Sequence, residues 1–228
     1  MSVTRKLTDA PAITPAPYWT TGICANHTGK MQGMLSISTT CHNNAFCKKM
    51  QSKEGTVCQK CYAERLAKTY AKSFLPKYEQ AGKELSERVL PVSELPKFDM
   101  ATNVVRIESF GELINTVHAI NYINIIKNNP WINFAWWTKR PNLIARALKE
   151  MGINFPDNCN VIYSNPYIDT IPKFQPYSFI DGYFTVWSSV EKALKNGCVI
   201  NCGKKRCKQC LNCYDAHSGI FYINELKK

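Results

Sequence analysis

Apolar residues follow two different spacings along the chain, and the first of them predicts helices in its amino-terminal half. After Cys58 they recur at every fourth position, which places them on one face of a helix. These residues are Tyr62, Leu66, Tyr70 and Phe74. Pro76 is expected to end this helix, and Lys77–Leu90 then has the pattern of a second one. Its inward-facing positions are expected to be Tyr78, Ala81, Leu85 and Val89.

The second spacing is an alternation of short β-branched runs with helical stretches. The predicted strands are Asn103–Ile107, Ile132–Trp137, Val161–Ser164 and Tyr183–Trp187, with an earlier one at Met34–Ile37. The predicted helices are Leu113–Lys127, Asn142–Met151 and Ser189–Asn196. This repetition predicts an α/β fold of parallel strands joined by right-handed crossovers, in a barrel, a partial barrel or an open sheet. In such folds ligands bind at the carboxyl ends of the strands.

The chain is expected to form one domain with two appendages. Its 228 residues suffice for a single full core. Residues 1–20 contain Pro11, Pro15 and Pro17, which interrupt regular hydrogen bonding and predict an extended surface arm. Residues 21–197 are expected to form the α/β domain, and residues 198–228 a cysteine-rich extension packed on it.

Eleven cysteines, an unusually high number, fall into two main sets. Near the carboxyl end three of them lie three residues apart, a spacing found in iron–sulfur binding loops, with a fourth just upstream. This set is Cys202, Cys207, Cys210 and Cys213. The other set is Cys41, Cys47, Cys58 and Cys61, with Cys24 as a fifth candidate. Both sets are predicted metal ligands, and the sequence leaves open whether they form one shared site or two.

The compartment argues for metal rather than disulfides. No apolar run approaches the length of a membrane span, and the first residues lack the apolar centre of a secretory signal, so we expect a cytoplasmic protein without membrane contact. Disulfides are rare in a reducing cytosol. One or two iron–sulfur clusters of the four-iron, four-sulfur type are favoured, structural zinc is the alternative, and disulfides or free thiols come third.

The formal charge of +12 favours polyanions such as nucleic acid as partners. The densest basic run is Lys204, Lys205, Arg206 and Lys208, beside the carboxyl-terminal cysteines. These side chains could equally offset the negative charge of a metal site, so both interpretations stay open.

Three short motifs carry a resemblance to a known family. They are Cys58–Arg65 (CQKCYAER), Phe110-Gly111-Glu112 after a predicted strand, and Trp137–Pro141 (WTKRP). In this order they resemble the phage gene-product-88 family, cysteine-cluster proteins similar to the radical S-adenosylmethionine superfamily. The resemblance spans roughly residues 30–215 and implies a small partial (β/α) barrel with a cluster at the strand ends. For a phage-encoded chain it also implies the host cytoplasm.

The resemblance also implies roles for individual residues. In the radical superfamily three cysteines bind the cluster, its fourth iron binds the methionine moiety of S-adenosylmethionine, and a Gly-Glu turn binds the methionine amine. Here Cys47, Cys58 and Cys61 would be the three ligands, and Gly111 and Glu112 the turn. Ten residues separate Cys47 from Cys58, unlike the family spacing, and Cys41 could occupy the fourth iron.

Four polar residues at predicted strand ends are candidates for chemistry. Glu108 and Glu112 are candidate catalytic carboxylates, and the alternative for them is an exposed helix start. Lys139 is a candidate catalytic residue, and Arg140 could hold an anionic cofactor or substrate through its guanidinium group. The alternative for these two is a solvated turn.

Three functions remain open at this point. The first is an iron–sulfur enzyme similar to the radical superfamily, which needs an open iron. The second is an iron–sulfur protein without that chemistry, acting in electron transfer with an electron donor, in redox sensing or with nucleic acid. The third is a zinc-stabilised binding module. The sequence specifies neither a substrate nor an oligomeric state.

Overall fold

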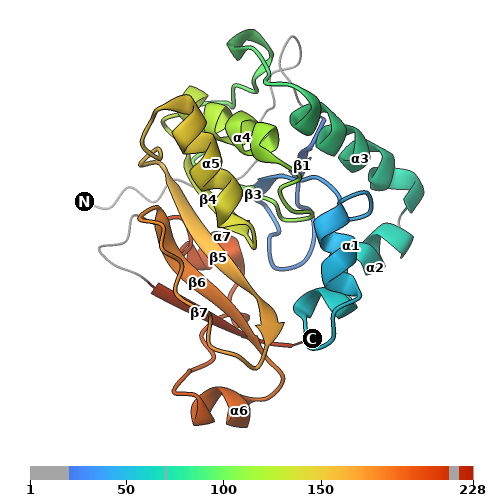
Figure 1. The fold of residues 1–228 in the computed structure, drawn as a ribbon, viewed down its shortest axis with the longest axis vertical. Helices are drawn as coiled ribbons and strands as arrows, with labels where there is room; N and C mark the ends of the chain where they lie inside the picture. Colours follow the sequence, from blue (N-terminus) through green and yellow to red (C-terminus); the bar gives the residue numbers. More distant parts are fainter. Residues whose placement is uncertain (1–20, 70, 216–220, 228) are drawn as a thin grey trace.

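A single seven-stranded sheet organises the molecule (Figure 1). The computed structural model describes residues 21–69, 71–215 and 221–227, so the predicted arm at residues 1–20 lies outside the described residues. The strands are β1 (Ile23–Ala25), β2 (Leu35–Ile37), β3 (Val104–Ile107), β4 (Asn133–Thr138), β5 (Cys159–Ile168), β6 (Ile180–Trp187) and β7 (Phe221–Leu226). They lie side by side in the order of the chain.

Strands β2 to β7 are all parallel to their neighbours, and β1 alone pairs antiparallel, with β2. The predicted α/β class with a parallel sheet is therefore confirmed. The sheet is open among the described residues, with β1 at one edge and β7 at the other. Because the strands from β2 onward are parallel, their carboxyl ends form one edge of the sheet, which we call the carboxyl-end edge.

Three helices cover one face of the sheet and bury the main core. They are α3 (Ala71–Glu87), α4 (Thr116–Asn128) and α5 (Pro141–Met151). Alternate strand residues point into this core, among them Val105, Phe134 and Trp136, none of which has exposed surface. Pro141 begins α5 and Gly152 ends it in the left-handed conformation, as the Pro-start and Gly-stop pattern predicts.

The opposite face of the sheet is covered by the carboxyl-terminal segment, which includes the short α7 (Cys207–Cys210). Met34, Ala135 and Tyr214 form one buried cluster there, with Cys207 and Cys213 packed against it. A second cluster on this face consists of Ile162, Phe184 and Ile223, against which Trp137, Cys202 and Cys213 pack. Trp136 packs in the main core and Trp137 against the second cluster, because successive side chains of a strand point to opposite faces of the sheet.

The amino-terminal helices differ from those predicted. Cys58 lies in a 3-10 helix, η1 (Val57–Lys60), and Cys61 immediately precedes α2 (Tyr62–Thr69). Pro76 does not end a helix, because α3 runs through it and packs Tyr78, Ala81 and Leu85 into the core. Val89 is wrongly predicted to be inward, since α3 ends at Glu87 and Val89 is 48% exposed. The predicted positions Tyr70 and Phe74 lie outside the described side chains.

Further differences concern connections. Helix α4 begins three residues later than expected, because Asn115 caps it and accepts a hydrogen bond from the backbone N–H of His118. No helix joins β5 to β6 among the described residues, whereas α6 (Val190–Lys195) follows β6 as predicted. Strands β1 and β7 were not predicted. The remaining elements are α1 (Ala45–Gln51) and the 3-10 helix η2 (Val92–Glu94).

No helix in the described part of the chain combines the length and the apolar character that crossing a bilayer would require.

Candidate functional site

The loops after β2, β3 and β4 meet at the carboxyl-end edge, where the segment after β2 supplies four cysteines, the loop after β3 supplies Glu112 and the loop after β4 supplies Lys139. We call Cys41, Cys47, Cys58 and Cys61 the first thiol group. Asn44 positions α1 by accepting from the backbone N–H of Phe46 and Cys47, while its Nδ2 donates to the carbonyl of Glu112 at 2.8 Å. The side chain of Thr56 caps η1 in the same way. Capping residues therefore fix the two short helices that carry Cys47 and Cys58.

Cys41 and Cys61 interact directly within the first thiol group. The thiol of Cys41 donates to the sulfur of Cys61, and this hydrogen bond lowers the pKa of Cys61 to about 6. The backbone N–H groups of Ala63 and Glu64, in the first turn of α2, act in the same direction. The same contact, together with burial, raises the pKa of Cys41. The hydrogen bond and the N–H groups of α2 thus favour the thiolate form of Cys61 over that of Cys41.

Lys139 lies among the sulfurs of this group. Burial acts to lower the pKa of Lys139, but the negative charges of Cys58, Glu112, Cys47 and Cys61 outweigh it and raise the pKa. Burial raises the pKa of Cys47 and of Cys58, and the ammonium of Lys139 opposes that shift at both. Lys139 therefore provides the positive charge that several deprotonated sulfurs would need.

Glu112 joins the end of β3 to the end of β4. Only 2% of its surface is exposed, and it accepts hydrogen bonds from Thr138 Oγ1 at 2.6 Å and from the backbone N–H of Lys139 at 2.7 Å. The backbone N–H of Leu113 is a third donor, at 3.0 Å. Both carboxylate oxygens are therefore occupied within the chain, and the alternative of an exposed helix start is wrong for this residue.

Glu108 is also buried, with 5% of its surface exposed. Its carboxylate accepts from Tyr122 Oη at 2.8 Å and from Thr39 Oγ1 at 2.9 Å. Burial raises its pKa to about 8, although these hydrogen bonds oppose the shift. Its φ of 55° is a strained conformation for a residue with a side chain. The exposed alternative is wrong here as well.

Gly111 has to be glycine in this turn. Its φ is 98°, and a Cβ at this position would lie 2.6 Å from Glu108 Oε2 and against the hydroxyl of Thr39. The predicted Gly-Glu turn therefore exists as a tight backbone turn, and the space beside it is filled by Thr39 and Glu108.

Arg140 does not project as a free anion-binding group. Its Nη1 donates to the carbonyls of Leu113 at 2.7 Å and Ile114 at 2.8 Å, and its guanidinium lies 5.1 Å from the centre of the Phe46 ring. Arg140 thereby ties the loop after β3 to α1. Cys24, the fifth candidate, is on β1 and hydrogen-bonds the side chain of Tyr78, which places it on a different element from the first thiol group.

The second thiol group consists of Cys202, Cys207, Cys210 and Cys213 and lies on the sheet face opposite the main helices. Lys30 Nζ donates to Cys202 Sγ at 2.9 Å and to Glu225 Oε1 at 3.0 Å. The carbonyl of Lys30 also accepts from the backbone N–H of Cys207 at 2.8 Å. Lys30 therefore joins the loop between β1 and β2 to the segment of the second thiol group and to β7.

The thiols of this group influence one another's pKa values. Burial raises the pKa of Cys213 to about 12, and the charges of Cys202, Cys207 and Cys210 act in the same direction. Arg106 opposes the shift, and its guanidinium lies 3.9 Å from the centre of the Trp137 ring. Burial raises the pKa of Tyr62, which adjoins Cys61, and Arg106 opposes that shift as well. It therefore stands between the two thiol groups.

The donor chemistry of both groups fits a thiolate-ligated metal centre with nearby positive charge. Among the described residues, however, no three His, Cys, Asp or Glu side chains lie close enough together to hold one metal ion. A tetrahedral zinc ion requires metal–sulfur distances of about 2.3 Å. Metal binding at either group would therefore require the sulfurs to move closer together.

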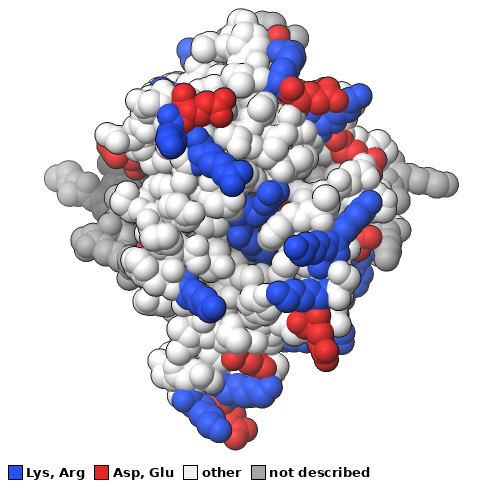
Figure 2. All heavy atoms as spheres, in the orientation of Figure 1, with Lys and Arg blue, Asp and Glu red and all other residues white. Residues whose placement is uncertain are grey.

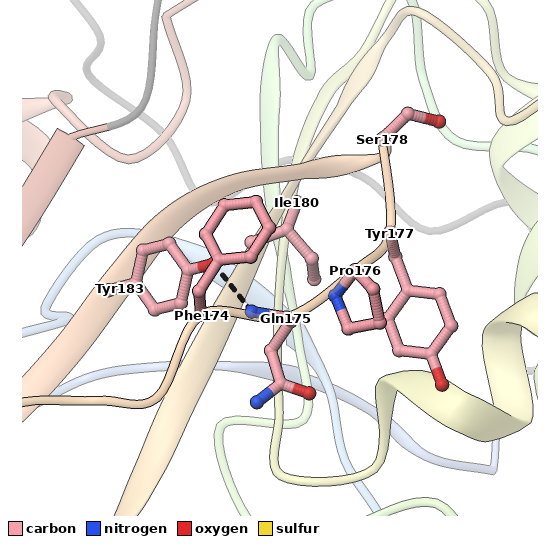
Figure 3. A pocket seen from close by; sticks show the side chains of 7 residues that line it. All are labelled: Phe174, Gln175, Pro176, Tyr177, Ser178, Ile180 and Tyr183. Atoms are coloured by element: carbon pink, nitrogen blue, oxygen red, sulfur yellow. Dashed lines mark hydrogen bonds between the residues drawn. The ribbon is translucent and has the colours of Figure 1, made fainter.

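A shallow pocket lies away from both thiol groups, in the connection between β5 and β6 (Figure 3). It has a volume of about 300 Å³ and is lined by Phe174, Gln175, Pro176, Tyr177, Ser178, Ile180 and Tyr183. The backbone N–H of Gln175 donates to Tyr183 Oη at 3.0 Å. The pocket has no charged side chain.

Several residues at the two groups were not predicted. Glu108 is contacted by Thr39 and Tyr122, and Glu112 by Thr138. Nothing in the sequence around these three residues indicates that they contact the glutamates. Arg106 did have a signal in the sequence. It is a charged residue between the apolar positions of a buried strand, so its side chain is expected on the sheet face opposite the main core. Lys30 has no signal of this kind, since its partners are 172 and 195 residues away.

The chain was compared with family models, with curated proteins and with solved structures, and none of the three comparisons gives a match.

Proposed function

We propose that the protein binds an iron–sulfur cluster at the first thiol group, with Cys41, Cys47, Cys58 and Cys61 as ligands, and uses it for electron transfer or redox sensing. The observation that supports this most is that three of these thiols, those of Cys47, Cys58 and Cys61, act on the ammonium of Lys139 at the carboxyl-end edge, while Cys41 interacts with Cys61. A cluster held by four thiolates is net negative, so Lys139 and the first N–H groups of α2 would offset its charge. Structural zinc with the same ligands is the alternative.

A second candidate function is that of an enzyme similar to the radical S-adenosylmethionine superfamily. Two features favour it, namely a strand order without reversal, which is typical of a partial (β/α) barrel, and the Gly111-Glu112 turn after β3. In this version Cys47, Cys58 and Cys61 hold the cluster and Cys41 is not a ligand. The occupied oxygens of Glu112 favour the first proposal instead.

We extend the proposal to a second cluster at the second thiol group. Its four thiols have Lys30 and Arg106 as nearby cations, as the first group has Lys139. In the described part of the chain, the sulfurs that most affect the pKa of Cys41 and Cys47 all belong to the first group. Those that most affect the pKa of Cys207 and Cys213 all belong to the second. Two separate centres are therefore proposed in place of a shared one.

The test is anaerobic purification followed by assays of iron, zinc and acid-labile sulfide and by electron paramagnetic resonance of the reduced protein. Two clusters predict about eight irons per chain, and one cluster predicts about four. Zinc without sulfide would remove both iron–sulfur functions. Spectra with and without S-adenosylmethionine separate the two candidates, since only an open iron responds to it.

Cysteine variants assign each centre. Cys58→Ser is expected to remove the iron of the first group only, and Cys210→Ser that of the second group only. Cys198→Ser is the control, because Cys198 belongs to neither group and its thiol contacts the carbonyl of Asn196. Cys41→Ala is expected to cost the first cluster. A retained cluster that responds to S-adenosylmethionine would instead support the enzyme.

A further inference from the structure

We propose that the surface formed by α1, η1 and the start of α2 binds single-stranded nucleic acid beside the first thiol group. This inference names a partner for the proposed site, but its test needs no cluster. The surface, called the basic surface below, carries the exposed side chains Lys48, Lys49, Lys53, Lys60 and Arg65.

The charge of this surface is one-sided. Between residues 45 and 65 the chain has these five basic residues and two acidic ones, Glu54 and Glu64. Glu64 is turned toward the thiol group, where its Oε2 lies 3.6 Å from Cys41 Sγ. In Figure 2 the blue basic side chains gather over α1 and the segments next to it. A surface of this kind attracts the phosphate backbone through release of its counterions.

The neighbouring helix α3 is a natural contrast. Along α3 the exposed basic residue Lys83 pairs with Glu87 at 3.9 Å, and Glu84 lies on the same helix. Basic and acidic side chains alternate there, so their fields largely cancel. The basic surface, with five basic and two acidic residues, is therefore a part of the chain where the positive charge is largely uncompensated.

An exposed aromatic ring favours a single strand over a duplex. Tyr62 is 54% exposed, although its hydroxyl donates to the carbonyl of Ser109 and its ring lies 5.5 Å from that of Phe110. Its ring is thus fixed at one end and accessible at the other. Unpaired bases stack on rings presented in this way, while adjacent cations hold the backbone. Arg65, one helical turn further along α2, supplies such a cation.

The experiment measures fluorescence polarisation of a labelled single-stranded oligonucleotide of about 20 nucleotides over about 50 to 200 mM KCl. The variant Lys48→Gln/Lys49→Gln/Lys60→Gln is compared with Lys97→Gln/Lys127→Gln/Lys149→Gln. Both triples remove three exposed lysines, and each includes two from the last turns of α-helices. Circular dichroism shows whether both remain folded.

The basic-surface triple is expected to weaken binding by about tenfold or more and to reduce the salt slope by about 2, while the control triple changes affinity less than about twofold. Tyr62→Ala should weaken binding to the single strand further.

Equal losses in the two triples would overturn the proposal, because net charge alone would then explain binding. Equal affinity for the duplex or for heparin would overturn the assignment to a single strand. Loss of cluster in the cysteine variants with intact nucleic-acid binding would separate this inference from the proposed function.

Discussion

The two thiol groups are built in different ways. The first depends on loops after three different strands, which buried Glu112 holds together through donors from β4 and from its own loop. The second depends on the local spacing of Cys207, Cys210 and Cys213 and is joined to the early part of the chain by the partly buried pair of Lys30 and Glu225. Similar sets of four thiols can therefore be supported by a buried tertiary network or by a short segment packed on a sheet.

The largest expected difference concerns the carboxylates that support the two groups. Glu112→Ala should lower the free energy of unfolding by about 3 to 5 kcal/mol, because it leaves Thr138 Oγ1 and two backbone N–H groups buried without acceptors. Glu225→Ala should cost about 1 kcal/mol or less, since its ion pair is partly solvated. Urea denaturation measures both. Similar costs for the two variants would show that the second group is supported as deeply as the first.

The next difference is a pH dependence confined to the first group. Burial raises the pKa of Glu108 from 4.5 to about 8, so the folded chain keeps a proton that the unfolded chain releases between these values. The stability from this group is full below about pH 4.5 and is lost as the pH rises through about 8. Glu108→Gln, which cannot ionise, should flatten the unfolding free energy between pH 5 and 8 by about 3 kcal/mol. If the unfolding free energies of the variant and the parent depend on pH in the same way, the raised pKa of Glu108 is contradicted.

Thiol reactivity in the reduced, metal-free protein gives a smaller contrast. Hydrogen bonding lowers the pKa of Cys61 to about 6, whereas burial raises that of Cys213 to about 12. Both residues are partly exposed. At pH 7 iodoacetamide should modify Cys61 about a hundredfold faster, since its larger thiolate fraction outweighs its lower nucleophilicity. Peptide mass spectrometry over time measures this ratio, and Cys41→Ser tests whether the Cys41 thiol causes it. Equal rates at the two sites would contradict the assigned hydrogen bond.

The smallest effect is expected at the cation of the second group. Lys30→Met removes the bonds to Cys202 and Glu225 but keeps the aliphatic stem, so it should destabilise by about 1 kcal/mol. Lys205→Met is the control, because Lys205 is exposed. Thermal unfolding of both variants measures the two losses of stability. A loss as large as that of Glu112→Ala would make Lys30 a central support of the fold.

The sheet was predictable where apolar spacing is regular. The predicted strand at Ile132–Trp137 and helix at Asn142–Met151 match β4 and α5, because alternation and a Pro-start with a Gly-stop are local signals. Strand β1 has three residues, too few for a period to be detected. Pro76 inside α3 was predicted wrongly, since the packing of Ala81 and Leu85 outweighs a local preference.

The candidate site was predictable in its residues but not in its arrangement. The spacing of the cysteines identified both groups, whereas their separation depends on which sheet face each segment covers. The burial of Glu108 depends on Thr39 and Tyr122, which come from a different loop and from α4. Such contacts between distant segments leave no trace in local spacing.

The strand order also bears on how the chain folds as it is synthesised. Each strand from β2 onward pairs with the strand made just before it, so the sheet can grow by one strand at a time as the chain leaves the ribosome. All four cysteines of the first group and Lys139 precede β5, whereas the second group awaits the last part of the chain. A ribosome that has reached β5 has therefore already released the first cysteine set, and the other set would be the last part of the molecule to mature.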